Sequence, residues 1–234
     1  MAGIKENLET VRENIAVAAK RSGRVAEDVT LITVTKNFDV SCIDAAIDCG
    51  ITDAGENRVQ EMLSKIDTVK SKLNWHMIGH LQTNKVKYIV DKVKMIHSVD
   101  TVKLLSEINR EAAKYDLVCD VLLEVNISGE ESKFGINPGT VYEMIEQAKT
   151  MPNICVKGLM TVAPYVVDPN ENRPYFRGIR QLFDQIKQEQ SGNIHMQYLS
   201  MGMSGDYEVA IEEGSNMVRV GSAIFGKRDY SKKI

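Results

Sequence analysis

Lys36 is the first candidate for a reactive group. It follows the apolar, β-branched run 31–35, which predicts a buried strand that ends at the lysine. Partial desolvation there lowers the pKa of an amine, and the larger neutral fraction can attack an aldehyde. A solvated lysine at a strand end is the alternative that position alone favours. Lys85, which opens a predicted helix, and Lys133, in a long loop, are rival amines.

Two runs of small residues near the C-terminus have the composition of phosphate-binding turns. The run Ser200–Asp206 contains two glycines and two serines and then opens a predicted helix, and Gly221-Ser222 is a second small turn. Backbone N–H groups at a helix start, together with a serine hydroxyl, suit a phosphate. An ordinary turn is the alternative for each run taken alone. The candidate ligand-binding residues in these runs are Ser200, Ser204, Gly205, Gly221 and Ser222.

Arg219 lies two residues before the second of these turns. Alternation along a strand places it on the same face as Gly221 and opposite its two valine neighbours. An arginine at that point can face a carboxylate, a phosphate or a ring nitrogen. A salt bridge to a nearby acid, such as Glu212 or Glu213, is the alternative.

The histidines and two glutamates have simpler interpretations. Three histidines are scattered along the chain without a metal-ligand spacing, so no metal site is predicted: His76, His97 and His195. His80 sits at a predicted strand exit, where a ligand contact and a structural hydrogen bond are equally expected. Glu56 and Glu61 flank a predicted helix start and are expected to serve that terminus.

The elements that must position these residues alternate regularly along the chain. An amphipathic helix over residues 4–22 leads, because its apolar residues recur at spacings of three and four. Eight strands are predicted over residues 30–36, 52–55, 75–79, 95–99, 121–127, 154–161, 196–200 and 217–220. The helices between them are predicted over residues 40–49, 59–69, 85–90, 102–115, 141–150, 175–189 and 207–213, with a short tail at the end.

This alternation predicts an α/β fold with parallel strands and crossover helices. Eight such units favour a closed (β/α)8 TIM barrel with an extra N-terminal helix, and a doubly wound open sheet is the alternative. In such a barrel the active site lies at the C-terminal ends of the strands, and the loops after strands seven and eight commonly bind phosphate. Lys36, Arg219 and both small-residue turns lie at predicted strand exits. We therefore expect one barrel domain over residues 1–234 with a phosphate site near Lys36.

The composition is that of an ordinary globular protein. Hydrophobic residues make up 43% and charged residues 26%, and 29 basic against 32 acidic side chains give a net charge of −3. This near-balance argues against a binder of nucleic acid or of membrane surfaces. We expect a cytoplasmic protein without a leader or a membrane span. Its four cysteines are expected to be reduced and mostly buried: Cys42, Cys49, Cys119 and Cys155.

A family resemblance rests on seven blocks that cover nearly the whole chain in order. They are Val34-Thr35-Lys36, Gly55–Glu61, Trp75–Gln82, Lys133-Phe134-Gly135, Gly158–Thr161, Leu199–Ser204 and Arg219–Gly226. These blocks resemble the YggS/PROSC family, known as the pyridoxal phosphate homeostasis proteins, which bind pyridoxal 5′-phosphate (PLP). That family is similar to the barrel domain of bacterial alanine racemase but lacks the C-terminal β-domain of that enzyme. The resemblance thus implies PLP as the cofactor.

The resemblance also implies roles for single residues. Lys36 would be the Schiff-base lysine, Arg219 would face the pyridine nitrogen, and Asn57 would lie near the ring. The phosphate would be held by Ser204, Gly221 and Ser222. Two positions differ from the family, in which threonine is common at both: Asn37 and Ser222.

Two functions of different classes remain. The first is a monomeric, non-catalytic carrier that buffers PLP and supplies it to PLP-dependent apo-enzymes, and the second is a PLP-dependent amino-acid racemase. A Schiff-base aldolase acting on a sugar phosphate is a weaker third hypothesis. A permanently protonated arginine cannot readily give a proton to the ring nitrogen, and a racemase needs a second base, which the β-domain supplies in alanine racemase. The candidates for that second base in this chain are Tyr165 and Tyr207, and packing roles are favoured for both. The carrier is therefore the favoured hypothesis.

Overall fold

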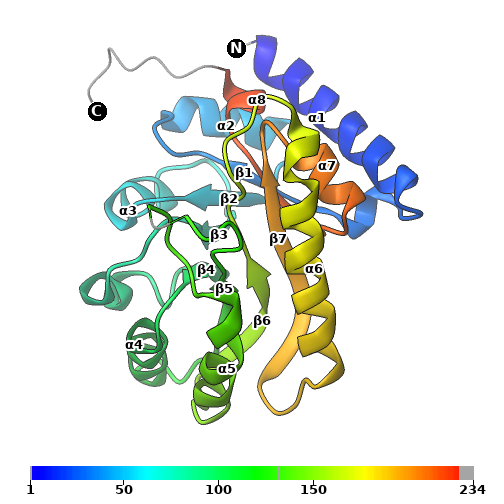
Figure 1. The fold of residues 1–234 in the computed structure, drawn as a ribbon. Coiled ribbons are helices and arrows are strands. Elements are labelled where there is room, and N and C mark those ends of the chain that lie inside the picture. Colours follow the sequence, from blue (N-terminus) through cyan, green and yellow to red (C-terminus); the bar gives the residue numbers. More distant parts are fainter. Residues whose placement is uncertain (1, 131, 227–234) are drawn as a thin grey trace.

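Eight parallel strands close into a barrel in the computed structural model, which describes residues 2–130 and 132–226 (Figure 1). Each strand pairs with its neighbour in sequence, and the last pairs with the first, so the predicted barrel is confirmed and the open sheet is wrong. The strands are β1 (Thr30–Val34), β2 (Asp53–Glu56), β3 (Asn74–Met77), β4 (Met95–Val99), β5 (Cys119–Glu124), β6 (Ile154–Met160), β7 (Ile194–Met203) and β8 (Met217–Val220).

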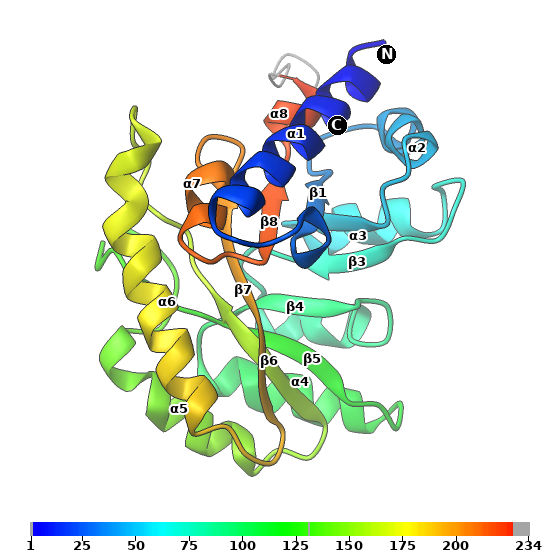
Figure 2. The same ribbon diagram turned by 90° about the vertical axis from the view of Figure 1, so that its right-hand side faces the viewer.

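Helices surround the barrel on its outer side (Figure 1). The α-helices are α1 (Ala2–Arg21), α2 (Val40–Asp48), α3 (Val59–Ile66), α4 (Val102–Ala113), α5 (Val141–Lys149), α6 (Arg173–Gln188), α7 (Tyr207–Glu212) and α8 (Ser222–Phe225). Four short 3₁₀ helices complete the layer: η1 (Ala26–Asp28), η2 (Thr83–Tyr88), η3 (Pro138–Thr140) and η4 (Pro169–Asn172). Figure 2 shows α1 lying beside α7 and α8, against which it packs.

Three local features differ from the sequence prediction. β1 ends at Val34, so Lys36 lies in a turn beyond the strand and not at its last position. The predicted helix over residues 85–90 is instead the end of the 3₁₀ helix η2, which stops at Tyr88, followed by a turn. The short helix α8 occupies the beginning of the predicted tail. The remaining elements agree in type with the prediction, and their ends shift by a few residues.

The interior of the barrel holds both apolar and polar side chains. Ile32, Met95, Leu122, Met160 and Met217 form a small buried cluster of their own. They come from strands on opposite sides of the barrel, so their side chains meet across its axis. A larger apolar core fills the space between the strands and the helices. The interior also contains buried polar side chains, and these build much of the candidate site.

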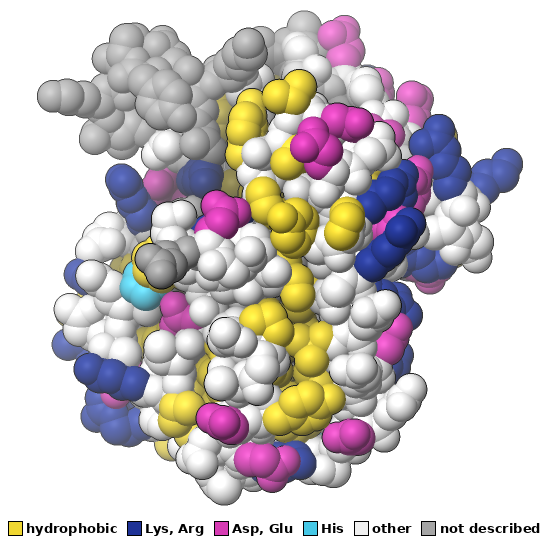
Figure 3. Space-filling model, in the orientation of Figure 1, with side chains coloured by type: hydrophobic (Ala, Val, Ile, Leu, Met, Phe, Trp, Pro, Cys, Tyr) yellow, Lys and Arg dark blue, Asp and Glu magenta, His cyan; other side chains and the backbone are white. Residues whose placement is uncertain are grey.

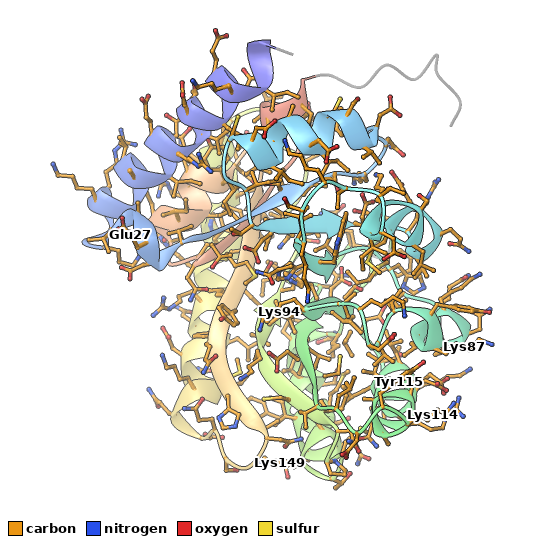
Figure 4. The ribbon with its side chains drawn as sticks, turned by 180° about the vertical axis from the view of Figure 1, so that it is seen from behind. Glu27, Lys87, Lys94, Lys114, Tyr115 and Lys149 are labelled. Carbon is orange, nitrogen blue, oxygen red and sulfur yellow. The ribbon has the colours of Figure 1, made fainter. Side chains whose placement is uncertain are left out.

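Many charged side chains lie on the outside of the helix layer. Figure 4 shows Lys87, Lys114 and Lys149 pointing away from the body of the protein. Figure 3 shows a band of hydrophobic side chains on another face, with charged side chains on both sides of it. No helix within residues 2–130 and 132–226 is long and apolar enough to cross a bilayer. The four cysteines are free thiols, two buried and two only partly buried, where mostly buried ones were expected.

Candidate functional site

The turn that carries Lys36 is held on both sides of that residue. Lys36 is half-buried, and Asn37 has a φ of 62°, in the left-handed region that asparagine tolerates better than most residues. The ammonium of Lys65 donates to the carbonyl oxygen of Thr35 at 2.9 Å. The N–H of Asn37 donates to a carboxylate oxygen of Glu61. Both peptide groups that flank Lys36 are therefore fixed by side chains of α3.

These contacts come from a buried group of charged residues between the barrel and α3. We call it the Lys65 cluster, and it consists of Thr35, Glu56, Glu61 and Lys65. Lys65 Nζ lies 2.8 Å from Glu56 Oε1 and 2.7 Å from Glu61 Oε1, and the Thr35 hydroxyl donates to Glu56 at 2.6 Å. Burial raises the pKa of Glu56, although the charge of Lys65 opposes the shift. The prediction that the two glutamates only serve a helix terminus is wrong, because both bind Lys65.

Two backbone N–H groups after β8 converge on one oxygen atom. Gly221 and Ala223 donate to the hydroxyl oxygen of Ser204 at 3.1 and 3.3 Å. A Cβ at Gly221 would lie 3.2 Å from both the Cβ and the carbonyl oxygen of Val34, so glycine lets this loop approach the end of β1 closely. The loops after β7 and β8 therefore meet beside β1. Converging N–H donors and a hydroxyl are the chemistry that binds a phosphate oxygen.

The other candidates from the two small-residue turns differ in exposure. Gly205 and Ser222 are exposed, and a Cβ at Gly205 would have no atom within 4 Å. Ser200 is fully buried in the barrel interior, where its hydroxyl accepts a hydrogen bond from Arg219 at 2.6 Å. Gly205 and Ser222 thus lie at the rim of the site, whereas Ser200 supports the arginine from within the barrel.

Arg219 points into the barrel and is 4% exposed. Its Nη1 also donates to the carbonyl oxygen of Ser200 at 2.8 Å, and its Nη2 donates to the carbonyl oxygen of Thr161 at 2.8 Å. Burial lowers its pKa to about 10, so the guanidinium remains protonated at neutral pH. A salt bridge to Glu212 or Glu213 is wrong, because those carboxylates pair with arginines of α6.

A cavity of about 520 Å³ opens at the C-terminal ends of β2, β3, β5 and β6, and Glu124 lines it. Burial and the charge of Asp100 raise the pKa of Glu124 to about 7, while Arg219 opposes the shift. Glu124 can therefore hold or release a proton near neutrality. Glu124 was not among the residues predicted from the sequence. The available signal was strand alternation, which places Glu124 on the same inner face as Leu122.

Asn57 and His80 line the same cavity. The side-chain oxygen of Asn57 is buried and has no hydrogen-bond partner within the described part of the chain. A Cβ at Gly79 would lie 2.6 Å from the carbonyl oxygen of Asn57, so glycine allows these two strand exits to touch. His80 stacks on Phe134, with 4.1 Å between the ring centroids. A buried amide oxygen without a partner is a group that a ligand in the cavity could satisfy.

Of the rival groups, Lys85 lines the cavity, whereas the others lie elsewhere. Lys133 forms an ion pair with Glu130 at 2.7 Å. Tyr165 is 97% exposed, so the packing role expected for it is wrong. Tyr207 is buried as expected, and its hydroxyl accepts a hydrogen bond from Asn14 of α1 at 3.1 Å. Neither tyrosine lines the cavity.

Two histidines that look scattered in the sequence are neighbours in the structure. His76 Nδ1 lies 2.9 Å from His97 Nε2, so the interpretation of isolated histidines is wrong for this pair. His195 is exposed on β7. Within the part of the chain that the structure describes, no three His, Cys, Asp or Glu side chains are grouped so that they could hold a metal ion.

The residues present fit PLP. Lys36 offers an amine, the N–H groups of Gly221 and Ala223 converge on an oxygen position, and Arg219 is a protonated donor. The unpaired oxygen of Asn57 adds an acceptor beside the cavity. An amine for an aldehyde, neutral donors for a phosphate and polar groups for a ring are the donor set that this ligand requires.

Comparisons with known proteins agree with this geometry. Residues 7–229 match the family model of the alanine racemase N-terminal domain. A pyridoxal phosphate homeostasis protein of Aquifex aeolicus is 46% identical over 226 residues, which cover 96% of this chain and 98% of that protein. PipY of Synechococcus elongatus, solved with PLP bound, is 30% identical with a TM-score of 0.83, over 95% of this chain and 100% of PipY. An alanine racemase of Clostridium difficile is 15% identical with a TM-score of 0.76, over 97% of this chain and 57% of the racemase, which is a likeness of fold alone. The chain therefore belongs to the family of the pyridoxal phosphate homeostasis proteins.

Proposed function

We propose that the protein binds PLP covalently through Lys36 and acts as a carrier that keeps PLP available in the cell. The register of β1 and β8 carries the proposal: Thr33 pairs with Val220, so the turns with Lys36 and Gly221 leave the barrel side by side. An amine and a set of phosphate donors then share one rim. The PLP-bound PipY and the homeostasis protein of Aquifex aeolicus, both similar to this chain over most of its length, support the proposal.

We assign the phosphate to Ser204, Gly205, Gly221 and Ser222. Their N–H and hydroxyl groups are neutral, so they recognise the phosphate through hydrogen bonds and not through ion pairs. Hydrogen bonds to a charged group contribute roughly 1.5–3 kcal/mol each. Pyridoxal, which has no phosphate, should therefore bind at least about tenfold more weakly than PLP.

We assign the ring to Arg219, with Ser200 supporting the guanidinium and Asn57 facing the ligand from β2. PLP, when bound, supplies an aldehyde that condenses reversibly with amines. The amine of Lys36 would hold the ligand through that aldehyde. Arg219 would donate a hydrogen bond to the ring nitrogen and keep its own proton. The contacts of the Lys65 cluster hold the backbone of the Lys36 turn during this exchange.

The carrier is favoured over the racemase by the position of the tyrosines. A racemase needs an acid or base on each face of the substrate. Tyr165 is exposed and Tyr207 is bound to Asn14, so neither offers a base to the cavity. Glu124 is the observation that favours racemase activity as the second candidate, because its pKa of about 7 lies in the useful range. We further propose that the carrier is a cytoplasmic monomer and that its partners are PLP-dependent apo-enzymes.

Borohydride trapping tests the carrier site directly. The purified protein is incubated with PLP, reduced with borohydride and digested, and the modified peptide is identified by mass spectrometry. We expect the adduct on Lys36, its loss in Lys36→Ala, and no change in Lys85→Ala, which is the control because Lys85 is an amine that lines the cavity beside Asn57. An adduct that remains mainly on Lys85 or Lys133 would refute the assignment.

Deuterium exchange separates the carrier from the racemase. PLP-loaded protein is incubated with L-alanine in deuterated water, and the α-proton and the enantiomer are followed by NMR and chiral chromatography. We expect no exchange above that of free PLP. Rapid exchange with formation of D-alanine, abolished by Lys36→Ala and by Glu124→Gln, would establish the racemase instead.

A further inference from the structure

A continuous line of hydrogen bonds crosses the interior of the barrel and ends at Arg219. Asp53 Oδ1 lies 3.0 Å from His76 Nε2, and His76 Nδ1 lies 2.9 Å from His97 Nε2. His97 Nδ1 then lies 3.2 Å from the hydroxyl of Ser200, which is 2.6 Å from Arg219 Nη1. We call these five residues the interior chain. Its members come from β2, β3, β4, β7 and β8, and its step from β4 to β7 spans the barrel axis.

The chemistry at its two ends fixes the direction of the terminal hydrogen bonds in the interior chain, and a single proton on each imidazole then fixes the rest. Arginine has only donors, so the oxygen of Ser200 accepts from Arg219, and the Ser200 hydroxyl proton is left to donate to His97 Nδ1. His97 then carries its proton on Nε2 and donates to His76 Nδ1. His76 likewise carries its proton on Nε2 and donates to Asp53, which as a carboxylate only accepts. With one proton on each imidazole, this is the one arrangement that satisfies all four contacts.

Burial makes the loss of any one of these hydrogen bonds costly. His97 and Ser200 are fully buried and His76 is 2% exposed, so a donor or acceptor left without its partner would carry the full cost of desolvation. Burial, the neighbouring His76 and the charge of Arg219 hold the pKa of His97 well below its usual value, which agrees with a neutral ring. A second proton on either ring would make His97 Nδ1 a donor to Ser200, and the buried hydroxyl proton of Ser200 would then lose its acceptor.

The interior chain ends at the guanidinium of Arg219, which is the member of the chain that would face a ligand. Three of the five guanidinium hydrogens go to the two oxygens of Ser200 and to the carbonyl of Thr161. The Nε hydrogen and the second Nη2 hydrogen have no acceptor within the described part of the chain. The Ser200 hydroxyl proton points to His97, which leaves the lone pairs of its oxygen to Arg219. The side of Arg219 that remains available to a ligand is thus defined by the chain behind it.

We propose that Ser200, His97, His76 and Asp53 act as positioning residues which orient Arg219 toward the ring of the bound ligand and thereby set the electronic state of that ring. The proposal rests on the PLP site proposed above. The buried histidines would influence the ligand without touching it, because the positions of their protons determine the hydrogen bonds behind Arg219. A merely structural network would affect the stability of the fold and leave the spectrum of the ligand unchanged.

Paired substitutions at His97 test the proposal. His97→Phe keeps the volume of a ring but removes both hydrogen bonds. His97→Gln keeps an acceptor for Ser200 and a donor for His76, and His195→Phe is the matched control on the exposed side of β7. We expect His97→Phe to shift the absorption band of bound PLP and to weaken PLP binding roughly tenfold, the effect of about one hydrogen bond. His97→Gln should retain most of the wild-type band and affinity, and His195→Phe all of both.

Nitrogen NMR of the histidines in the ligand-free wild-type protein gives a second test that does not depend on any variant folding. We expect two buried neutral imidazoles that carry their protons on Nε2. A proton on Nδ1 of either ring, or a folded His97→Phe protein with the wild-type band and affinity, would overturn the proposal. Wild-type protein that fails to take up PLP would instead count against the proposed function, and the NMR spectrum would still decide the order of protons.

Discussion

The two faces of β2 bury their carboxylates in opposite ways. Glu56 faces the helix layer, where the ammonium of Lys65 lies 2.8 Å away. Asp53 faces the barrel interior, where it accepts hydrogen bonds from His76 at 3.0 Å and from Thr52 at 2.6 Å. Burial raises the pKa of Glu56, whereas these hydrogen bonds lower the pKa of Asp53 in spite of its partial burial.

The two faces of β2 therefore have different roles, one in the stability of the fold and the other in ligand binding. In the Lys65 cluster, opposite charges touch, so the loss of one partner leaves a buried charge without compensation. In the interior chain, three neutral groups separate the carboxylate from the guanidinium, so a change at one group alters the order of protons more than the balance of charge. The first arrangement holds the backbone around Lys36, and the second orients Arg219. Glu56 on one face of β2 thus helps to hold the turn of Lys36, and Asp53 on the other face helps to orient Arg219.

The largest effect is expected when the Lys65 cluster loses its cation. Lys65→Met leaves Glu56 and Glu61 facing each other without the ammonium that joins them. Removal of one partner from a buried ion pair costs about 3–5 kcal/mol. We therefore expect the free energy of unfolding in urea at pH 7 to fall by that amount, followed by circular dichroism. PLP uptake should fall with it, because the Lys36 turn loses its contact at Thr35.

An exposed ion pair provides the control for this change. Lys70 pairs with Asp48 at the surface, and Lys70→Met should cost less than about 1 kcal/mol. The double variant Glu56→Gln/Lys65→Met should recover part of the loss, because it removes one of the stranded charges. Equal effects of Lys65→Met and Lys70→Met would show that the Lys65 cluster is no more important than a surface pair.

The second effect concerns Glu124, which faces Arg219 from the inner side. Its pKa rises from an ordinary 4.5 to about 7. Between these two pH values, the folded protein keeps a proton on Glu124 that the unfolded chain releases. Its contribution to stability is therefore complete below about pH 4.5 and is lost as the pH rises through 7. Glu124→Gln should flatten this dependence, with a difference of up to about 3 kcal/mol between pH 5 and pH 8. Urea unfolding at four pH values measures it, and parallel curves for both proteins would contradict the shift.

Much of the fold was predictable from the sequence because its signals are local. Short β-branched runs alternate with helical periodicity eight times, and the count indicates a barrel. The rim residues were predictable for the same reason, since the fold fixes the strand ends as the place for the site. That rule places Lys36, Ser204 and Gly221 at the rim, and their roles toward a ligand stay predictions.

The polar networks were not predictable, because they depend on which strands face each other after the barrel closes. His76 and His97 look like two lone core histidines, and only the register of β3 and β4 brings their rings together. Ser200 looks like one more small residue in a phosphate turn, although the structure buries it under Arg219. Pairing across an interior is a property of tertiary structure and leaves no mark on local sequence.

The smallest expected effect concerns Asn37, which joins the Lys65 cluster through its N–H. The family resemblance leads us to expect threonine here, yet the φ of 62° places this residue in the left-handed region, where a β-branched side chain is strained. Asn37→Thr should therefore lower the free energy of unfolding by about 1–2 kcal/mol, whereas Asn37→Gly should change it by less than about 1 kcal/mol, because glycine enters this region freely. Both variants keep the N–H that donates to Glu61, so the contacts around Lys36 should survive in each. Urea unfolding measures the difference, and PLP titration shows whether the strained threonine moves the amine. If the threonine variant proved as stable as the wild type, the turn would be free to adopt another conformation, and the hold of the Lys65 cluster on Lys36 would be weaker than these contacts indicate.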